Sequence, residues 1–335
     1  MAATRTLPWS WYSDPDVLRR ERERIFRCSW HYAGHAGEVA QAGDFVTALA
    51  GDVPLVVVRG EDDALRGFVN VCRHRGHEVA TGSGRRRTLQ CRYHAWTYAL
   101  DGSLRSAPRS GEQDAFDRSE LSLVPASVAE WGPLVFVSPD PEAPLAEVLG
   151  DVPARLGADL PELRFHSRVE YDVRANWKVV VENYLECYHC PVAHPGFSAV
   201  VDVDPAAYRL EAGDWTSSQL GPARNGEGEG HFHFVWPATR LNVFPGPPNL
   251  SVGTAWPDGS ERTRGYFDYF FAAGVPDDDA AELIAFDAQV GAEDRELVES
   301  VQRGVGSGIV EDGRLLPESE RLVAHFQGLV RRALG

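Results

Sequence analysis

The sequence contains very little of several residue types, and each shortage excludes a class of protein. Lysine occurs once, at Lys178, so arginine supplies almost all of the positive charge, which we attribute to compositional bias. The formal net charge of −16 argues against nucleic acid or an anionic membrane as the main partner. No stretch approaches the ~20 apolar residues that a membrane span needs, and residues 1–11 lack the regions of a signal peptide. We therefore expect a cytoplasmic protein.

Cysteine is also scarce, with five in 335 residues. They are Cys28, Cys72, Cys91, Cys187 and Cys190. An odd, widely spaced set without a secretion signal does not suit a disulfide framework. Metal ligation and packing are therefore the roles to consider for these side chains.

The predicted secondary structure changes twice along the chain, from helical to β-rich and then to mixed. After Ser13-Asp14-Pro15, an arginine- and glutamate-rich helix is expected over Val17–Phe26. Short β-rich runs separated by turn signals follow, at Phe45–Leu49, Pro54–Val58, Gly67–Val71, Trp96–Leu100 and Leu134–Val137. Later helices are expected at Asn176–Tyr188, at Ala280–Gln302 with a break near Gly291, and at Glu318–Leu334. This order predicts an α+β fold with a small antiparallel β domain over residues 40–145 and a larger domain over 146–335, onto which the segment 1–39 packs.

The first candidate metal motif lies in the predicted β domain. It reads Cys72-x-His74, then sixteen residues, then Cys91-x-x-His94. Structural zinc sites favour at least two residues between paired ligands, and here one pair is separated by a single residue. Each half also combines one Cys with one His, which suits a Rieske [2Fe–2S] centre with two Cys on one iron and two His on the other. A zinc-binding module or hydrolase is the alternative.

The second candidate motif supplies two more histidines. Glu186 and His189 are three residues apart and are expected on one helix face, with Glu182 on the same side. Pro191 cannot continue a helix, so His194 should come from the turn beyond and curl back toward His189. Two histidines placed in this way supply part of a facial triad, which needs one further carboxylate and leaves positions open for O₂.

With both motifs, the sequence resembles the oxygenase (alpha) subunits of the Rieske non-haem iron, ring-hydroxylating family. The resemblance runs from Leu7 to about Gln327 and is strongest to the choline, glycine betaine and carnitine oxygenase branch. It implies a catalytic domain of the helix-grip type, with an antiparallel sheet and helices. It also implies two cofactors, the [2Fe–2S] cluster and a mononuclear Fe(II), and O₂ as co-substrate.

The family resemblance also assigns roles to two carboxylates. Asp294, in the segment 292–302, matches the distal iron ligand, and spacing alone leaves Glu293 open as the alternative. Glu186 matches the residue that bridges an iron histidine, His189, to a cluster histidine of the neighbouring subunit. The resemblance thus implies a homo-oligomer, a trimer in our prediction, and a separate reductase or ferredoxin that passes on electrons from NAD(P)H.

Cys187 and Cys190 form a Cys-x-x-Cys pair, which could be a redox dithiol. The flanking Glu186, His189 and His194 explain the segment better, so we interpret the two cysteines as packing residues.

The substrate is the least certain part of the sequence-based prediction. Aromatic residues in 231–236 and 241–245, with Tyr184, Tyr188 and Trp215, suit either a flat aromatic ring or a trimethylammonium group through cation–π contacts. The branch resemblance favours the second, with hydroxylation or oxidative N-demethylation beside the nitrogen. Aromatic-ring hydroxylation is the alternative activity. A Rieske electron carrier without oxygenase activity is the alternative of another class, although it leaves residues 176–195 and 292–302 unexplained.

Overall fold

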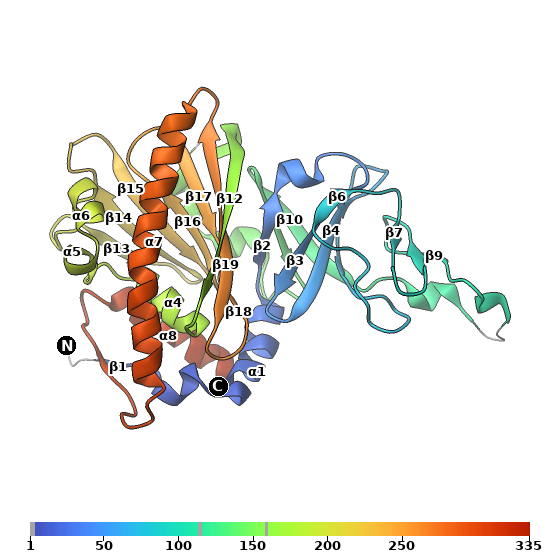
Figure 1. Cartoon of the computed structure of the whole chain (residues 1–335), viewed down its shortest axis with the longest axis horizontal. Helices are drawn as coiled ribbons and strands as arrows, with labels where there is room; N and C mark the ends of the chain where they lie inside the picture. The colour runs from blue at the N-terminus through green and yellow to red at the C-terminus, as the bar shows by residue number, and fades with distance from the viewer. Residues whose placement is uncertain (1–3, 113–115, 158–159) are drawn as a thin grey trace. The chain divides into compact units, whose positions relative to one another are not determined.

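A computed structural model describes residues 4–112, 116–157 and 160–335 (Figure 1). The chain forms two compact units, one made of Phe26–Leu145 and the other of the chain before it together with Ala146–Gly335. Every strand pair in both units is antiparallel among the described residues. The predicted α+β class is therefore confirmed.

The unit Phe26–Leu145 contains a seven-stranded sheet in the order β2-β11-β10-β5-β4-β3-β6 and a small three-stranded sheet, β7-β8-β9. The strands of the larger sheet are β2 (His31–His35), β3 (Asp44–Ala50), β4 (Val53–Arg59), β5 (Leu65–Val69), β6 (Ser83–Arg85), β10 (Pro125–Trp131) and β11 (Leu134–Ser138). Those of the smaller sheet are β7 (Leu89–Gln90), β8 (Thr97–Tyr98) and β9 (Leu104–Ser106). Short 3₁₀ helices are η2 (Phe26–Cys28), η3 (Ala36–Val39), η4 (Ser110–Glu112) and η5 (Arg118–Leu121).

Strand β4 shows how the larger sheet supports the first metal motif. Side chains alternate between the two faces of a strand. Leu55 and Val57 pack into one apolar cluster, while Val56 and Val58 pack into another that contains Cys72 and Cys91. The continuous apolar run of β4 is thus explained by burial on both faces, and one face forms the base of the cysteine loops.

The boundary between the two units differs from the predicted one. The prediction placed the whole segment 1–39 with the larger unit. In the structure only the chain up to Ile25 belongs there, and residues from Phe26 onward belong to the smaller unit. The reason is that β2 pairs with β11, with Tyr32 opposite Phe136. The sequence His31-Tyr-Ala-Gly-His35 lacks β-branched residues, so its pattern gave no strand signal.

The second unit contains an eight-stranded sheet in the order β12-β19-β17-β16-β15-β14-β13, with β18 beside β19, and a two-stranded β1-β20 pair. The strands are β1 (Thr4–Arg5), β12 (Leu163–Val173), β13 (Arg209–Ala212), β14 (Thr216–Pro222), β15 (Glu229–Val235), β16 (Thr239–Val243), β17 (Asn249–Gly253), β18 (Trp256–Pro257), β19 (Thr263–Ala272) and β20 (Arg314–Leu315). The helices are η1 (Trp9–Tyr12), α1 (Pro15–Arg24), α2 (Leu145–Leu149), α3 (Val152–Leu156), η6 (Leu160–Glu162), α4 (Trp177–Tyr184), α5 (Cys190–Ala193), α6 (Pro195–Val200), α7 (Asp277–Val305) and α8 (Arg321–Leu334).

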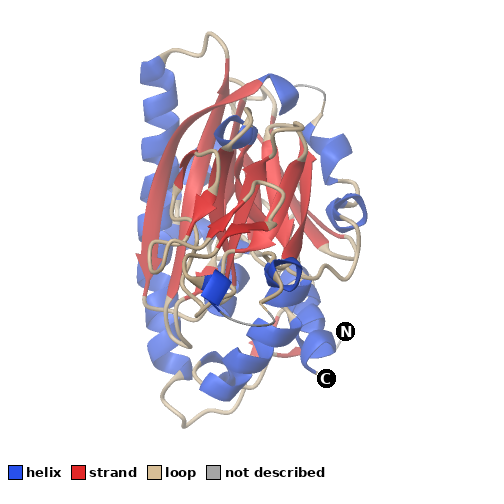
Figure 2. Ribbon diagram, turned by 90° about the vertical axis from the view of Figure 1, so that its right-hand side faces the viewer, coloured by secondary structure: helices blue, strands red, loops and turns tan. Residues whose placement is uncertain are grey.

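Helix α7 runs along the strands of this sheet (Figures 1 and 2) and packs beside α4. Its first turn carries Asp277, Asp278 and Asp279, whose negative charges favour a helix N-terminus. The break expected near Gly291 is absent, and α7 is continuous over 29 residues. A glycine inside a helix costs about 1 kcal/mol, which the long contact surface offsets. None of the helices in the described part of the chain is long and apolar enough to cross a membrane.

The only lysine of the chain has a structural role that the sequence did not reveal. Lys178 is fully buried, and its Nζ lies 2.6 Å from Oε1 of Glu21 on α1, which is also fully buried. Glu21 accepts a second hydrogen bond from the Trp177 indole, and the Tyr12 ring lies 5.2 Å from Nζ. This buried pair fastens the N-terminal helix to α4.

Replacing Lys178 with methionine should lower the free energy of unfolding by about 3–5 kcal/mol, because the buried Glu21 carboxyl group then loses its cationic partner. Denaturant unfolding followed by circular dichroism measures the loss. The double variant with Glu21→Leu removes both charges and should recover most of it. Wild-type stability in the single variant would show that the pair does not fasten the helix.

Candidate functional site

The four candidate cluster residues lie at the tips of two loops of the smaller unit. In each loop the cysteine is buried and the histidine is exposed: Cys72 and Cys91 are 2% exposed, and His74 and His94 face solvent. Hydrogen bonds from the amide of Cys72 to the His77 carbonyl and from that of Cys91 to the Trp96 carbonyl close the loops. The imidazole rings of His74 and His94 lie 4.6 Å apart. Two buried thiols with two outward imidazoles fit a [2Fe–2S] centre bound through one iron to sulfur and through the other to nitrogen.

Tyr98 is a residue of this site that the sequence analysis missed. Its hydroxyl lies 3.3 Å from Cys72 Sγ and accepts a hydrogen bond from the Arg73 amide at 2.9 Å. Burial, the largest effect, raises the pKa of the Cys72 thiol, while the Tyr98 hydroxyl acts in the opposite direction. Tyr98 therefore favours negative charge on that sulfur. The only signal in the sequence was its place on a strand seven residues after Cys91.

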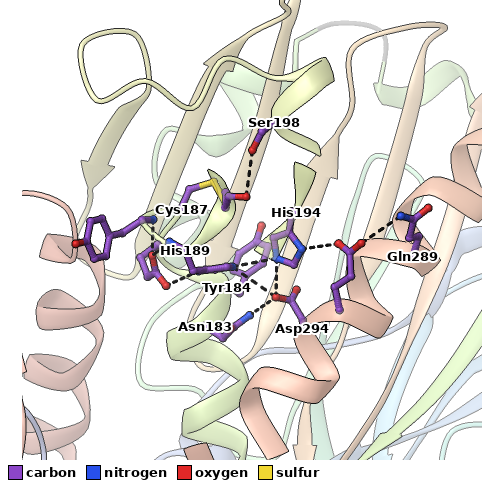
Figure 3. Close-up of polar contacts among 12 residues, drawn as sticks. Asn183, Tyr184, Cys187, His189, His194, Ser198, Gln289 and Asp294 are labelled. Carbon is purple, nitrogen blue, oxygen red and sulfur yellow. Dashed lines mark hydrogen bonds and ion pairs between the residues drawn. A yellow bond between two sulfur atoms is a disulfide. The ribbon is translucent and has the colours of Figure 1, made fainter. Parts of the chain in front are cut away.

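In the larger unit, the second candidate metal site is formed by side chains from three segments (Figure 3). The Nε2 atoms of His189 and His194 lie 3.1 Å apart, and Asp294 Oδ1 lies 3.5 Å and 2.9 Å from them. Ligands at right angles around an ion, with bonds of about 2.1 Å, would themselves be about 3 Å apart. The three atoms thus have the spacing of one face of a metal coordination sphere. Among the described residues, this is the one group of His, Cys, Asp and Glu recognised as able to hold an ion.

A carboxylate orients the outer nitrogen of each histidine. His189 Nδ1 lies 2.5 Å from Glu186 Oε1, and His194 Nδ1 lies 2.7 Å from Glu293 Oε2. Metal-ligating histidines usually donate their second N–H in this way, which fixes the ring and its tautomer. Glu293 therefore lies on the far side of His194 from the point where the three ligand atoms meet.

The pKa shifts of His189 and Asp294 show that the site favours bound positive charge. Burial acts to lower the pKa of His189, but hydrogen bonds to Asp294 and Glu186 outweigh it and raise the pKa to about 9. For Asp294, burial acts to raise the pKa, yet hydrogen bonds from His189 and His194 hold it below the usual range. Asn183 Nδ2 adds a third bond to Asp294, at 2.6 Å. A metal cation can take the place of the protons that these groups share.

The three candidate ligands open onto a cavity of about 240 Å³ between α4, α7 and the eight-stranded sheet. Its lining is mostly aromatic and apolar with a few charged groups. Phe197, Phe232 and Phe244 form a connected group of rings with centroid separations of 5.4 and 5.5 Å. A cavity of this kind suits a small organic molecule.

The structure corrects two local predictions at this site. Helix α4 ends at Tyr184 instead of Tyr188, so Glu186 and His189 lie in a turn and do not share a helix face. Glu182, expected beside Glu186, instead bonds to the Tyr12 hydroxyl at 2.8 Å. The chain leaves the helix early because the Glu186 carboxylate binds the backbone amides of Tyr188 and His189, in competition with helical bonding.

Cys187 and Cys190 also differ from the prediction. Both lie in an apolar cluster with Phe197 and Phe232, as expected of packing residues. However, they are joined by a disulfide, with Cα atoms 4.9 Å apart. The sequence predicted packing and no disulfide framework, and it missed this single bond, which forms because the turn after α4 brings the two Cα atoms within disulfide range.

The predicted aromatic pocket is only partly correct. Tyr184, Phe232 and Phe244 line the cavity. Trp215 lies in a different surface depression, and Tyr188 is 64% exposed. Phe234 and Trp236 pack on Phe326 of α8, so burial in the core explains them.

Comparison with known families matches most of the chain. Residues 29–122 match the Rieske [2Fe-2S] domain, and residues 160–335 match the ring hydroxylating alpha subunit (catalytic domain).

Curated relatives are similar over almost the whole length. The chain is 38% identical to the carnitine monooxygenase oxygenase subunit of Acinetobacter pittii, over 97% of this chain and 94% of that protein. It is 34% identical to the chloroplastic choline monooxygenase of Arabidopsis thaliana, over 98% of this chain and 83% of that one.

Among solved structures, the quaternary ammonium Rieske monooxygenase CntA in complex with its substrate L-carnitine superimposes with a TM-score of 0.88 at 35% identity, covering 99% of this chain and 96% of that one. Naphthalene 1,2-dioxygenase from Rhodococcus sp. gives a TM-score of 0.80 at 22% identity, over 98% and 94% of the two chains, and shares the fold.

Proposed function

The chain belongs to the Rieske-type ring-hydroxylating oxygenases, and we propose that it is the oxygenase subunit of a monooxygenase for a quaternary ammonium compound. As a member of this family, it is an enzyme with a [2Fe–2S] cluster and a mononuclear iron, and it receives electrons from a separate reductase. The proposal rests on one observation: His189, His194 and Asp294 lie close together at the edge of an aromatic-lined cavity. The substrate class follows from the carnitine and choline monooxygenase relatives.

We propose Cys72, His74, Cys91 and His94 as the cluster ligands. Their burial pattern supports this, because the histidine side of the cluster would face solvent and could pass electrons outward. When bound, the cluster supplies one electron at a time. The protein's part is to hold the two loops apart by the correct distance and to donate a hydrogen bond from Tyr98 to a cysteine sulfur.

Replacing Tyr98 with phenylalanine should lower the reduction potential of the cluster without releasing it. A hydrogen bond to a cluster sulfur stabilises the more negative, reduced state, and a loss of about 1.4 kcal/mol corresponds to about 60 mV for one electron. Redox titration followed by electron paramagnetic resonance measures the shift. An unchanged potential would mean that the hydroxyl serves only the Arg73 amide.

We propose His189, His194 and Asp294 as the iron ligands, with Glu186 and Glu293 orienting the two imidazoles. When bound, the iron supplies O₂ activation at the positions that three ligands leave open. The chain's own contribution is to fix both rings and to present an apolar cavity that excludes water around the substrate.

We further propose that Glu186 connects this site to the cluster of a neighbouring subunit. A carboxylate has about four lone-pair positions, and Glu186 uses one oxygen for the His189 ring and the other for the amides of Tyr188 and His189. One lone pair, on Oε1, therefore remains for an imidazole N–H of a partner subunit. The neighbouring Tyr188 and Val192 are 64% and 88% exposed, as expected of apolar side chains that a second subunit covers. The trimer and the cytoplasmic location stay predictions.

Product analysis tests the proposed function. The purified oxygenase, loaded with both cofactors and supplied with NADH and a matched reductase, is offered quaternary amines and arenes in separate reactions. Release of trimethylamine or formaldehyde, or a hydroxylated amine, supports the proposal. If only arenes are turned over, the activity is aromatic-ring hydroxylation instead. If neither class is turned over with both metals present, the proposed function is refuted.

A further inference from the structure

The cavity contains a buried cation to which the proposed chemistry assigns no role. Arg240 lies on β16, is 7% exposed and lines the same cavity as His189 and Asp294. Asn242, two residues along the strand, faces the same way and accepts a hydrogen bond from the Tyr184 hydroxyl at 2.7 Å. The alternation of the strand therefore directs Arg240 toward the cavity instead of toward the far face of the sheet.

The guanidinium of Arg240 has no carboxylate within 4.0 Å among residues 4–112, 116–157 and 160–335. Its Nη2 donates to two neutral acceptors, the Tyr171 hydroxyl at 2.6 Å and the Thr254 carbonyl at 3.2 Å. Its Nε is buried and has no acceptor. By contrast, Arg168 of the same unit is bound by both oxygens of Asp268, at 2.6 and 2.7 Å. A buried charge is costly unless an opposite charge compensates it, so Arg240 lacks the anion that such a group requires.

Three aromatic rings of the cavity lining lie around the Arg240 guanidinium. The guanidinium carbon lies 4.6 Å from the ring centre of Phe267 and 5.5 and 5.6 Å from those of Tyr171 and Tyr184. These three rings are already in cation–π contact with the Arg240 guanidinium. Phe197 and Phe232, in the apolar cluster beside the His189–His194 segment, remain for contact with a substrate ammonium.

Asp287 is the acidic residue best placed to balance the positive charge of Arg240. It lines the cavity on α7, seven residues before Asp294, and accepts a hydrogen bond from the Tyr269 hydroxyl at 2.8 Å. Burial raises the pKa of Asp287 to about 6, and the charge of Arg240 acts to lower it. Asp287 and Arg240 form no ion pair within 4.0 Å among the described residues, so Asp287 does not occupy the guanidinium.

We propose that Arg240 binds a carboxylate group of the substrate, so that the substrate is a betaine with a quaternary ammonium group at one end and a carboxylate at the other. This inference rests on the proposed function and narrows it. Carnitine carries such a carboxylate, whereas choline carries a hydroxyl, so Arg240 selects between the two substrate types of the curated relatives. The ammonium end lies toward the proposed iron ligands, where its methyl or methylene carbon is hydroxylated, and the carboxylate end lies at Arg240.

The test compares γ-butyrobetaine with its methyl ester, which has one additional methyl group and no negative charge. Arg240→Gln should raise KM for the betaine by ~30-fold or more, since it removes one partner of a buried charge pair. KM for the ester should change by less than ~3-fold. Arg240→Lys keeps a charge and should recover part of the loss. Arg264→Gln, at an exposed arginine of the same sheet outside the cavity lining, is the matched control and should behave as wild type.

Calorimetric titration of the anaerobic, cofactor-loaded protein gives a second readout that does not depend on turnover. The dissociation constant of the betaine should rise in Arg240→Gln by the same factor as KM. Equal losses for betaine and ester, or a wild type that prefers the ester or choline, would overturn the inference while the proposed function stands. If Asp287→Asn abolishes the effect of Arg240→Gln, Asp287 is the partner and the inference fails. Wild-type protein that accepts no quaternary amine would refute the proposed function itself.

Discussion

Replacing Asp294 with alanine should remove one iron per subunit and reduce product formation to background, while the visible spectrum of the cluster stays unchanged. Two imidazoles alone hold a divalent ion poorly, and Asp294 Oδ1 lies 2.9 and 3.5 Å from the two Nε2 atoms and completes the group able to hold an ion. Metal analysis together with the spectrum of the cluster measures the two centres separately. His194→Ala should have the same result.

Glu293→Gln is the matched control, because Glu293 neighbours Asp294 on α7 but bonds to the outer nitrogen of His194 and to Gln289, not to the Nε2 atoms. This variant should keep its iron and lose about 10–100-fold of activity, as is typical when a group that orients a metal ligand is changed. If Asp294→Ala kept full iron and activity while Glu293→Gln lost both, the carboxylate ligand would be Glu293.

Glu186→Gln should leave both metal centres occupied and the cluster reducible, yet slow product formation about 100-fold or more, the upper end of the effect of such orienting groups. The amide keeps the length of the side chain but loses the charge-assisted hydrogen bond to His189 and the one proposed to a partner histidine. Rapid mixing of the pre-reduced protein with O₂ and substrate isolates electron transfer from substrate binding. Iron-free Glu186→Gln protein would refute the bridging role.

A second measurement separates bridging between subunits from an effect within one subunit. If the path crosses an interface, diluted monomers with both centres intact should not turn over. Fully active monomers would rule out the inter-subunit path. The role of Glu186 would then be limited to orienting the His189 ring.

Much of this arrangement could be predicted because its signals are local in the chain. Cys72 with His74 and Cys91 with His94 are pairs whose spacing already limits the metal that they can bind. His189 and His194 are five residues apart around a proline, and Pro191 does lie in the first turn of α5, so that His194 follows this short helix and turns back. The strands around Phe45, Val56 and Leu134 were also visible, since alternation and apolar runs depend on neighbours within a few residues.

Other features depended on hydrogen bonds and packing contacts that residue types and spacing alone do not reveal. The end of α4 at Tyr184 depends on hydrogen bonds of Glu186 to backbone amides, which compete closely with helical bonding. The break expected at Gly291 did not occur because packing along α7 outweighs the intrinsic preference of one glycine. The pairing of β2 with β11 joins segments about 100 residues apart, and its sequence had no strand signal.

The sequence by itself determined the family of chemistry, two metal motifs and an α+β fold, because ligand identity and short-range spacing fix which metal a loop can hold. Only the tertiary structure decided which carboxylate lies beside both Nε2 atoms, because Asp294 and Glu293 are adjacent in the sequence and leave α7 in different directions. It also decided that the single lysine is a buried partner of Glu21 and that Arg240 enters the cavity without a carboxylate within 4.0 Å among the described residues. Burial and electrostatic pairing are properties of groups brought together from distant parts of the chain, and no local pattern records them.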